Sequence, residues 1–231
     1  MKKKFLFSVF FLFLFSVVTN AFAQIYKGQM APCPPPKRLK DELYVGVGAG
    51  YDAYRIRQSF DILDSAAVTR SGNPVLSANG FQGSIFAGYG RYFGWFYIAG
   101  ELLANYTEAQ THFSTGPYNT NISLRTSYGA SLLPGIRLGD QSLLYGRLGY
   151  IRTYLKSVEG GTTAGNATDS NWENGADLGV GVETLLIGNL SLRAEYNHIF
   201  YNAFTTPLST RISPSNNQFV LGLVYHFDPF E

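Results

Sequence analysis

The chain has 231 residues, of which 45% are hydrophobic, 16% aromatic and only 15% charged. Three of its 18 basic residues are Lys2, Lys3 and Lys4, so the rest of the chain is close to neutral against 16 acidic residues, which excludes a basic nucleic-acid-binding protein. Cys33 is the only cysteine, so there is no internal disulfide framework; it is interpreted as an idle thiol, with an intermolecular disulfide or lipidation as alternatives.

The N-terminus has the order of a secretory leader. Three lysines precede the apolar run at 5–15, and Ala21-Phe22-Ala23 follows it, which predicts a signal peptide at 1–23. No later segment approaches the roughly 20 unbroken apolar residues of a membrane helix, so a membrane-spanning mature chain must cross with closed strands. Residues 24–42, with Cys33-Pro34-Pro35-Pro36, are predicted to form a periplasmic N-terminal arm because prolines do not join a sheet interior.

Alternation of apolar and polar or small residues predicts eight strands in the remainder. Connections after the second, fourth and sixth strands are short, whereas the others, including 57–79 and 157–174, are long and polar. This places every long loop on one side, as in outer-membrane barrels with extracellular loops. The predicted strands are 43–54, 81–92, 96–107, 122–138, 143–156, 175–186, 190–200 and 218–227.

The composition of the two strand faces decides between two kinds of eight-stranded barrel. A soluble lipocalin-like barrel turns its apolar face inward. Here the polar face carries many glycines and few charges, which suits a narrow lumen, and the apolar face ends in aromatic rings that suit membrane interfaces. The fold class predicted is all-β: an eight-stranded antiparallel up-and-down transmembrane β-barrel at 43–227, with a tail at 228–231.

The closing strand shows this alternation most clearly. Its large apolar residues are predicted to form a lipid-facing row, opposite Gln218, Gly222 and His226. A closing strand that ends in an aromatic residue resembles the last strand of outer-membrane barrels, which the barrel-assembly machinery recognises. Phe227 or Phe230 is then the terminal signal. The row comprises Phe219, Leu221, Leu223, Tyr225 and Phe227.

The same parity predicts a set of charged side chains that point into the lumen. An eight-stranded barrel has only enough width for its own side chains, so these charges are expected to pair across strands and to plug the barrel. The predicted network comprises Glu101, Arg125, Arg137, Arg147, Asp177, Glu183, Arg193 and Glu195.

Several short motifs together resemble one family. The opening Tyr44-Val45-Gly46, Gly-Tyr pairs at 50–51, 88–89 and 149–150, Glu195-Tyr196 and the close at 222–227 are similar to the opacity-protein and OmpA-like surface antigens of Gram-negative bacteria. The resemblance implies an outer-membrane location, contact with outer-membrane lipid and lipopolysaccharide, assembly by the barrel-assembly machinery, and adhesion or host contact through four external loops without enzymatic activity. A porin-like small-solute pore is one alternative.

Catalytic and metal chemistry find little support. His112, His198 and His226 lie in separate segments without ligand spacing, and neither a metal nor a cofactor is predicted. The stretch 198–202 resembles the His-x-Ser-Asn motif of lipid A deacylases, but Phe200 replaces the serine, so the attacking hydroxyl is missing; a lipid A-modifying hydrolase using His198 stays a second alternative. Residues 169–173 lack calcium-loop spacing, and Trp172 is interpreted as an interfacial residue, with a recognition anchor as the alternative.

Overall fold

The computed structural model describes residues 39–63, 69–115, 118–162, 165–205 and 211–227. All of them belong to the second of two compact units, Met1–Pro36 and Lys37–Glu231. The predicted signal peptide at 1–23, most of the arm at 24–42 and the tail at 228–231 lie outside the described residues. No helix long and apolar enough to cross a membrane occurs in the described ranges.

Eight long antiparallel strands make up most of the described chain. Three short strands, β2 (Thr69–Gly72), β5 (Gln110–Thr115) and β10 (Phe204–Thr205), pair with them at one end. The long strands are β1 (Glu42–Leu63), β3 (Val75–Phe93), β4 (Phe96–Thr107), β6 (Tyr118–Leu138), β7 (Ser142–Thr162), β8 (Gly165–Ile187), β9 (Leu190–Tyr201) and β11 (Arg211–Phe227).

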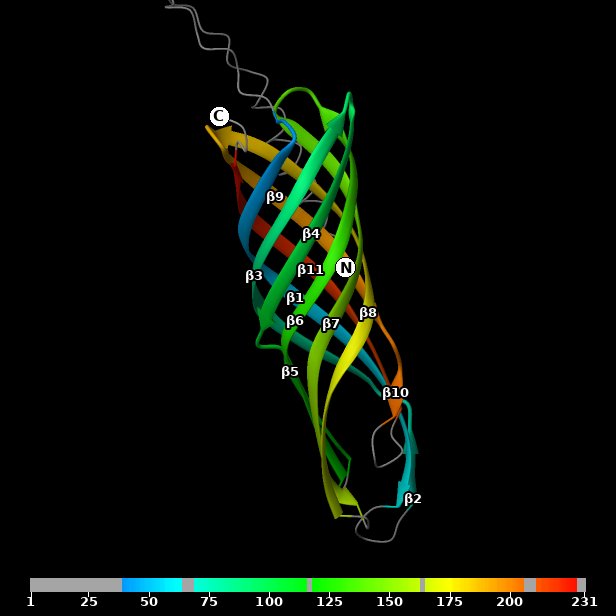
Figure 1. Cartoon of the computed structure of the whole chain (residues 1–231). Coiled ribbons are helices and arrows are strands. Elements are labelled where there is room, and N and C mark those ends of the chain that lie inside the picture. Colours follow the sequence, from blue (N-terminus) through cyan, green and yellow to red (C-terminus); the bar gives the residue numbers. More distant parts are fainter. Residues whose placement is uncertain (1–38, 64–68, 116–117, 163–164, 206–210, 228–231) are drawn as a thin grey trace, which may run out of the picture. The chain divides into compact units, whose positions relative to one another are not determined.

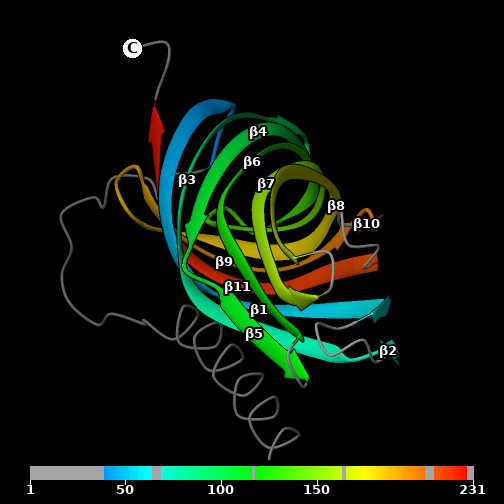
Figure 2. The same ribbon diagram turned by 90° about the horizontal axis from the view of Figure 1, so that it is seen from below.

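The long strands form a closed ring. Each pairs with the next along the chain, and β11 returns to β1 in a register that runs from Leu43 opposite Phe227 to Ser59 opposite Arg211. Figures 1 and 2 show the ring from the side and from its end. Closure leaves the long strands without a free edge in the ring. The predicted fold class, an eight-stranded antiparallel up-and-down barrel, is confirmed.

Tight turns join the strands at one end, here called the turn end. The β3–β4, β6–β7 and β8–β9 turns contain Gly94, Gly139 and Gly188, whose φ angles of 67°, 79° and 57° lie in the left-handed region. Glycine adopts this conformation without a Cβ clash. These are the three connections for which the sequence predicts short turns.

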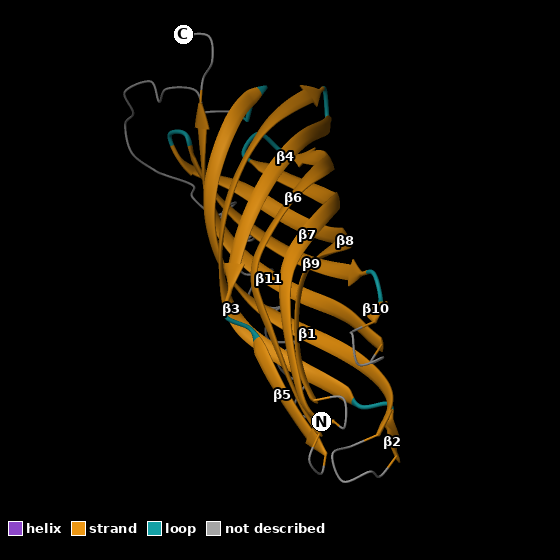
Figure 3. Ribbon diagram, turned by 60° about the horizontal axis from the view of Figure 1, so that its bottom comes forward, coloured by secondary structure: helices purple, strands orange, loops and turns teal. Residues whose placement is uncertain are grey.

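The opposite end, here called the hairpin end, differs from the prediction of long irregular loops at 57–79 and 157–174. β1 continues to Leu63 and pairs with β2, and the β7–β8 ladder continues to Thr162 opposite Gly165. Figure 3 shows these strands running on beyond the ring. Antiparallel pairing satisfies the backbone hydrogen bonds whatever the polarity of the side chains. The polar composition of these segments therefore predicted loops where the backbone forms paired strands.

The outer wall of the ring is apolar. Phe81, Leu102 and Ile85 are 79%, 67% and 62% exposed, and similar side chains surround the barrel. A continuous apolar surface of this extent needs a nonpolar environment, and a closed barrel crosses the hydrocarbon layer with every wall backbone group paired.

The lumen is packed, with an apolar cluster near each end. The cluster at the turn end includes Tyr44, Tyr97 and Leu133, and Leu39 packs into it with only 2% exposure. The cluster at the hairpin end comprises Tyr54, Ile56, Ala78, Ala109, Ile122, Leu124, Leu155 and Ile212. The layer between the two clusters is polar and charged.

Candidate functional site

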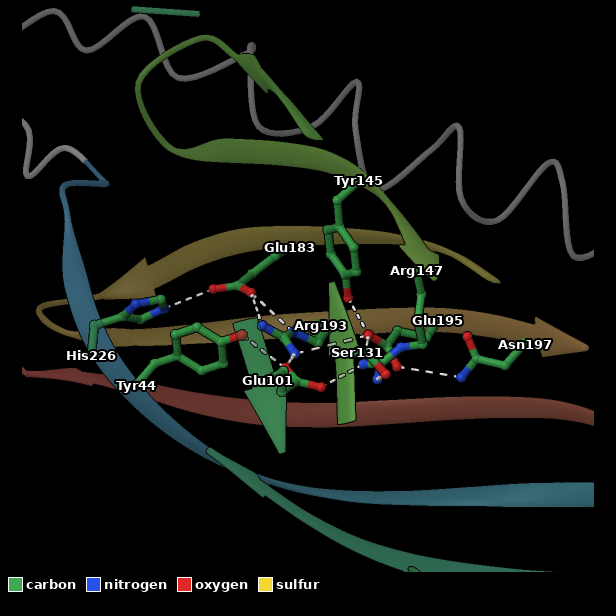
Figure 4. A network of polar contacts seen from close by, with 10 residues as sticks. All are labelled: Tyr44, Glu101, Ser131, Tyr145, Arg147, Glu183, Arg193, Glu195, Asn197 and His226. Carbon is green, nitrogen blue, oxygen red and sulfur yellow. Dashed lines mark hydrogen bonds and ion pairs between the residues drawn. The ribbon is translucent and has the colours of Figure 1, made fainter. Parts of the chain in front are cut away.

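A network of buried charges fills the centre of the lumen (Figure 4). Arg193 on β9 places Nη1 2.5 Å from Glu101 Oε2 and Nη2 2.8 Å from Glu183 Oε2. Arg147 on β7 places Nη2 2.6 Å from Glu101 Oε1 and 2.8 Å from Glu195 Oε1. Glu101 on β4 therefore bridges the two arginines. Residues from four strands, β4, β7, β8 and β9, are joined by charge-assisted hydrogen bonds, which are stronger than neutral ones.

Tyrosines complete the coordination of these charges. The hydroxyl of Tyr44 donates to Glu101 Oε2 at 2.9 Å, and that of Tyr145 donates to Glu195. The Arg193 guanidinium lies over the rings of Phe86 and Tyr44, at 4.7 and 5.0 Å from their centroids. Buried charges are costly unless their remaining donors and acceptors are satisfied. These aromatic residues supply hydroxyl donors and π faces to charges that water would solvate at the surface.

Small residues on the inner face make room for this packing. A Cβ on Gly88 would overlap the Tyr44 hydroxyl and lie 2.6 Å from the Gly100 carbonyl oxygen. The inward glycines predicted from the alternation therefore accommodate the large rings of neighbouring strands, as a narrow barrel requires.

His226 joins the network, a role that the sequence analysis did not assign to it. Its Nε2 lies 2.7 Å from Glu183 Oε1 and its Nδ1 3.3 Å from Glu42 Oε1. Ser191 Oγ is 2.9 Å from the same Nε2. The available signal was its position on the polar face of the closing strand, which the ring turns inward.

Asp177 is buried at 2% exposure but forms no ion pair among the described residues. It lines a cavity of about 20 Å³ together with Ser84 and Asn197. Asp177 Oδ1, Ser84 Oγ and Asn197 Oδ1 have no hydrogen-bond partner within the described part of the chain. A space of this size accommodates about one water molecule.

The structure therefore brings five of the eight predicted lumen residues into one network, with Asp177 beside it and two others elsewhere. The prediction that Arg125 points into the lumen is wrong. The β6–β7 register shifts between Leu124 and Ser127, both of which face inward at 1% and 4% exposure. Two residues then occupy the place of one, so Arg125 is exposed on the outer face, with Nη1 3.3 Å from the Tyr106 hydroxyl. A β-bulge breaks the strict period of two on which the prediction rested.

Arg137 is also outside the predicted network. It lies near the turn end, where its Nη2 donates to the carbonyl oxygen of Leu39 at 2.6 Å and its guanidinium lies 4.1 Å from the Tyr92 ring centroid. It is only partly buried. The assumption that every inward charge meets a carboxylate is wrong for Arg137, because a backbone carbonyl and an aromatic ring are its partners.

The closing row lies on the outer face of the ring. Leu221, Leu223, Tyr225 and Phe227 are 43–48% exposed, and Phe219 is partly buried. The five residues stand opposite outward residues of β1, for example Leu223 opposite Val47. The two strands thus share one apolar surface where the barrel closes.

Catalytic and metal sites are weakly supported. His198 is partly buried and its Nδ1 lies 2.7 Å from Asn217 Oδ1, with its ring against Phe200. In the stretch 169–173, Asn171 Nδ2 donates to both carboxylate oxygens of Asp169, at 3.1 and 3.0 Å. Within the described ranges there is no group of three or more His, Cys, Asp or Glu side chains suited to a metal ion.

The closed ring, the apolar wall and the filled lumen define a transmembrane β-barrel. Residues 10–227 match the family model described as the outer membrane protein beta-barrel domain. The chain belongs to this family and is located in the bacterial outer membrane. No curated protein matches it.

Solved structures of outer-membrane barrels are similar to the chain in fold. Ail, the attachment invasion locus protein of Yersinia pestis, is 15% identical, with a TM-score of 0.43 and coverage of 82% of this chain and 100% of that one. Neisserial surface protein A is 16% identical, with a TM-score of 0.40 and coverage of 78% and 97%. The outer membrane protease OmpT from Escherichia coli is 10% identical, with a TM-score of 0.46 and coverage of 83% and 98%.

Proposed function

We propose that this protein is a non-enzymatic surface protein whose barrel is a membrane mount and whose hairpins contact other surfaces, by adhesion or host and environment contact. The observation that carries the proposal is the continuation of paired strands past the lipid-facing wall. β7 and β8 pair from Arg152 opposite Asn174 to Glu159 opposite Ala167, and short strands reinforce β1, β6 and β11.

The hairpin-end core supports this proposal. Ile56, Ile122 and Ile212 have no exposed surface, and Tyr54 is 2% exposed. Packing of this kind holds projecting strands in fixed positions, and a rigid scaffold that presents exposed segments is a common arrangement for recognition. The outward side chains there are mainly polar, including Ser59, Ser77 and Asn121.

The experiment shortens individual hairpins without touching this core. Residues 158–168 are replaced by a two-residue turn that rejoins Ser157 and Asp169, which are cross-strand partners. A matched variant replaces residues 61–71, between the partners Phe60 and Gly72. Cells displaying either variant are expected to lose binding to host cells or matrix glycoproteins, while a shift in gel mobility on heating, compared with the unaltered protein, checks that the barrel still folds. Undiminished binding by both variants would refute the contact role.

The filled lumen disfavours the pore alternative. The Arg147–Glu101–Arg193 bridge crosses the lumen, and a neighbouring cavity is only about 20 Å³ in volume. We expect planar-bilayer recordings of the full mature protein to show no stable open channel. A persistent ohmic conductance would make the small-solute pore the better proposal.

The contacts of His198 within the described part of the chain give the hydrolase alternative no support. The His198 Nδ1 lies 2.7 Å from Asn217 Oδ1, which also accepts a hydrogen bond from the Tyr196 hydroxyl, and the His198 ring packs against Phe200. None of these three residues is a serine. Incubation of the pure protein with lipid A is expected to release no acyl chain. Acyl release that is abolished by His198→Ala would establish the enzyme instead.

A further inference from the structure

The part of β8 that extends beyond the ring is paired on one side only. On that side β7 pairs with it in an unbroken register as far as Ala167. On the other side the pairing with β9 ends at Gly175, and one further bond runs from the Asn202 N–H to the Asn174 carbonyl oxygen. β10 then pairs with β11 rather than with β8, and Figure 1 shows it apart from this part of β8. Within the described part of the chain, residues 167–173 therefore have one unpaired edge, here called the free edge.

The direction of the backbone groups identifies the residues that form the free edge. Successive residues of a strand point their N–H and C=O groups toward opposite sides. The Asn174 carbonyl points toward β9, so the backbone groups of Thr168, Ser170 and Trp172 point the same way. Each of these residues offers one donor and one acceptor at the free edge.

The free edge lacks the features that protect the edges of most sheets. Proteins blunt such edges with lysine, proline, β-bulges or very short strands. Residues 167–173 contain neither lysine nor proline, and their register with β7 has no shift. An edge of this kind can accept an extended segment of another chain as an additional strand, held by backbone hydrogen bonds.

The inner face of the sheet beside the free edge is acidic. Asp169 stands opposite Ser157, which is 2% exposed, and Glu173 stands opposite a residue that is 1% exposed. Directly paired residues share a face of the sheet, so both carboxylates lie on the inner face. Asn171 lies between them and donates to Asp169 from Nδ2 at 3.1 and 3.0 Å. Neither carboxylate forms an ion pair within the described ranges.

These charges distinguish between two kinds of occupant. In a second copy of the chain, antiparallel self-pairing centred on Asn171 would place Asp169 of each copy opposite Glu173 of the other. Like charges directly opposite are destabilising, whereas opposite charges stabilise a strand pair. A foreign segment with lysine or arginine at the matching positions is therefore favoured over a second copy.

We propose that the free edge of β8 binds an extended segment of another protein as an additional antiparallel strand, with basic side chains opposite Asp169 and Glu173. Backbone hydrogen bonds hold the segment, and the two cations, spaced four residues apart on one face, select it. The inference rests on the contact function proposed for the hairpins and defines the chemistry of a partner for the β7–β8 hairpin.

A synthetic peptide serves as the probe. It consists of nine residues, all threonine except for lysine at its third and seventh positions. The full mature protein with Trp95→Phe, which leaves Trp172 as the only tryptophan, is folded into phosphatidylcholine vesicles. We expect a saturable change in Trp172 emission, with an affinity about tenfold higher than for the same peptide with glutamate at the two positions. Moving the second lysine to the sixth position puts the cations on opposite faces and is expected to weaken binding about threefold.

Amide hydrogen exchange shows whether the peptide pairs with the free edge. In the protein alone, the amides of Ser170 and Trp172 are expected to exchange faster than those of Asn171 and Glu173, which point toward β7. The lysine peptide is expected to slow exchange at Ser170 and Trp172 by about tenfold. In antiparallel pairing the backbone nitrogens at the even positions of the peptide face β8. A peptide methylated at these nitrogens is expected neither to bind nor to slow exchange.

Matched variants test the edge and the carboxylates in the protein. The Ser170 N–H faces the free edge, so Ser170→Pro removes an edge donor without removing a bond to β7, and we expect peptide affinity to fall about tenfold. Ser170→Ala is the control and is expected to bind unchanged. Asp169→Asn with Glu173→Gln is expected to abolish the preference for the lysine peptide over an all-threonine peptide. A shift in gel mobility on heating checks the fold, and if Ser170→Pro does not fold, the methylated peptide carries the test.

Three results with the peptides would overturn the proposal. They are equal binding of the lysine and glutamate peptides, equal binding of the methylated peptide and its parent, or no added protection of the Ser170 amide. Dimers of the full protein that Ser170→Pro abolishes would also overturn it, because the occupant would then be a second copy. Host-cell binding that is lost on replacement of residues 158–168 but unchanged in Ser170→Pro would refute edge pairing and leave the contact function intact.

Discussion

Neutralising Glu101 tests whether the charges of the lumen network are shielded from water and stabilise one another. In Glu101→Gln the side chain keeps its shape but loses the charge that bridges Arg147 and Arg193 at 2.6 and 2.5 Å. A close ion pair is worth about 4 kcal/mol at an effective dielectric constant of 20. Glu195 and Glu183 still hold one arginine each, which offsets part of the loss, so we expect destabilisation by about 3–5 kcal/mol.

The assay is reversible urea unfolding of the protein in lipid vesicles, followed by gel mobility and tryptophan fluorescence. Glu108→Gln removes an exposed glutamate and serves as the control, with an expected change within about 0.5 kcal/mol. Adding Arg147→Met to Glu101→Gln removes a cation that has already lost one of its two carboxylate partners, so the double variant is expected to cost less than the two single costs combined, by about 0.5–3 kcal/mol. If Glu101→Gln costs no more than the control, lumen water solvates these charges and the reasoning is wrong.

Two pairs of substitutions test the wall and the lumen packing. Leu223→Lys, on the lipid-facing row, is expected to cost about 2–4 kcal/mol and Phe227→Lys, at the rim, about 0–1 kcal/mol; equal penalties in folding titrations into lipid would contradict the register. Gly88→Ala is expected to cost about 1–3 kcal/mol, because its Cβ meets Tyr44 and a backbone oxygen. Gly100→Ala, on the adjacent strand with open space around its Cβ, is expected to be near neutral, and a similar loss for both in urea unfolding would show that packing is not the cause.

The sequence alone was sufficient for the barrel and for most of its wall. Period-2 alternation is a local property, so it located the eight strands, the three turns and the lipid-facing row without knowledge of their partners. The same parity turned Glu101, Arg147, Glu183, Arg193 and Glu195 inward. The predicted strands were too short at the hairpin end, because polar residues such as Ser157 and Asn174 pair through their backbones, which composition does not reveal.

Only the tertiary structure decided which of these side chains meet. A single bulge after Leu124 moved Arg125 from the lumen to the outer face, and no local signal in the sequence marks where a strand gains an extra residue. The partners of Arg193 lie on β4 and β8, and His226 reaches Glu42 and Glu183 only because β11 closes on β1. Strand stagger around the ring sets which inward residues share a layer, and stagger is a property of the closed barrel rather than of any one strand.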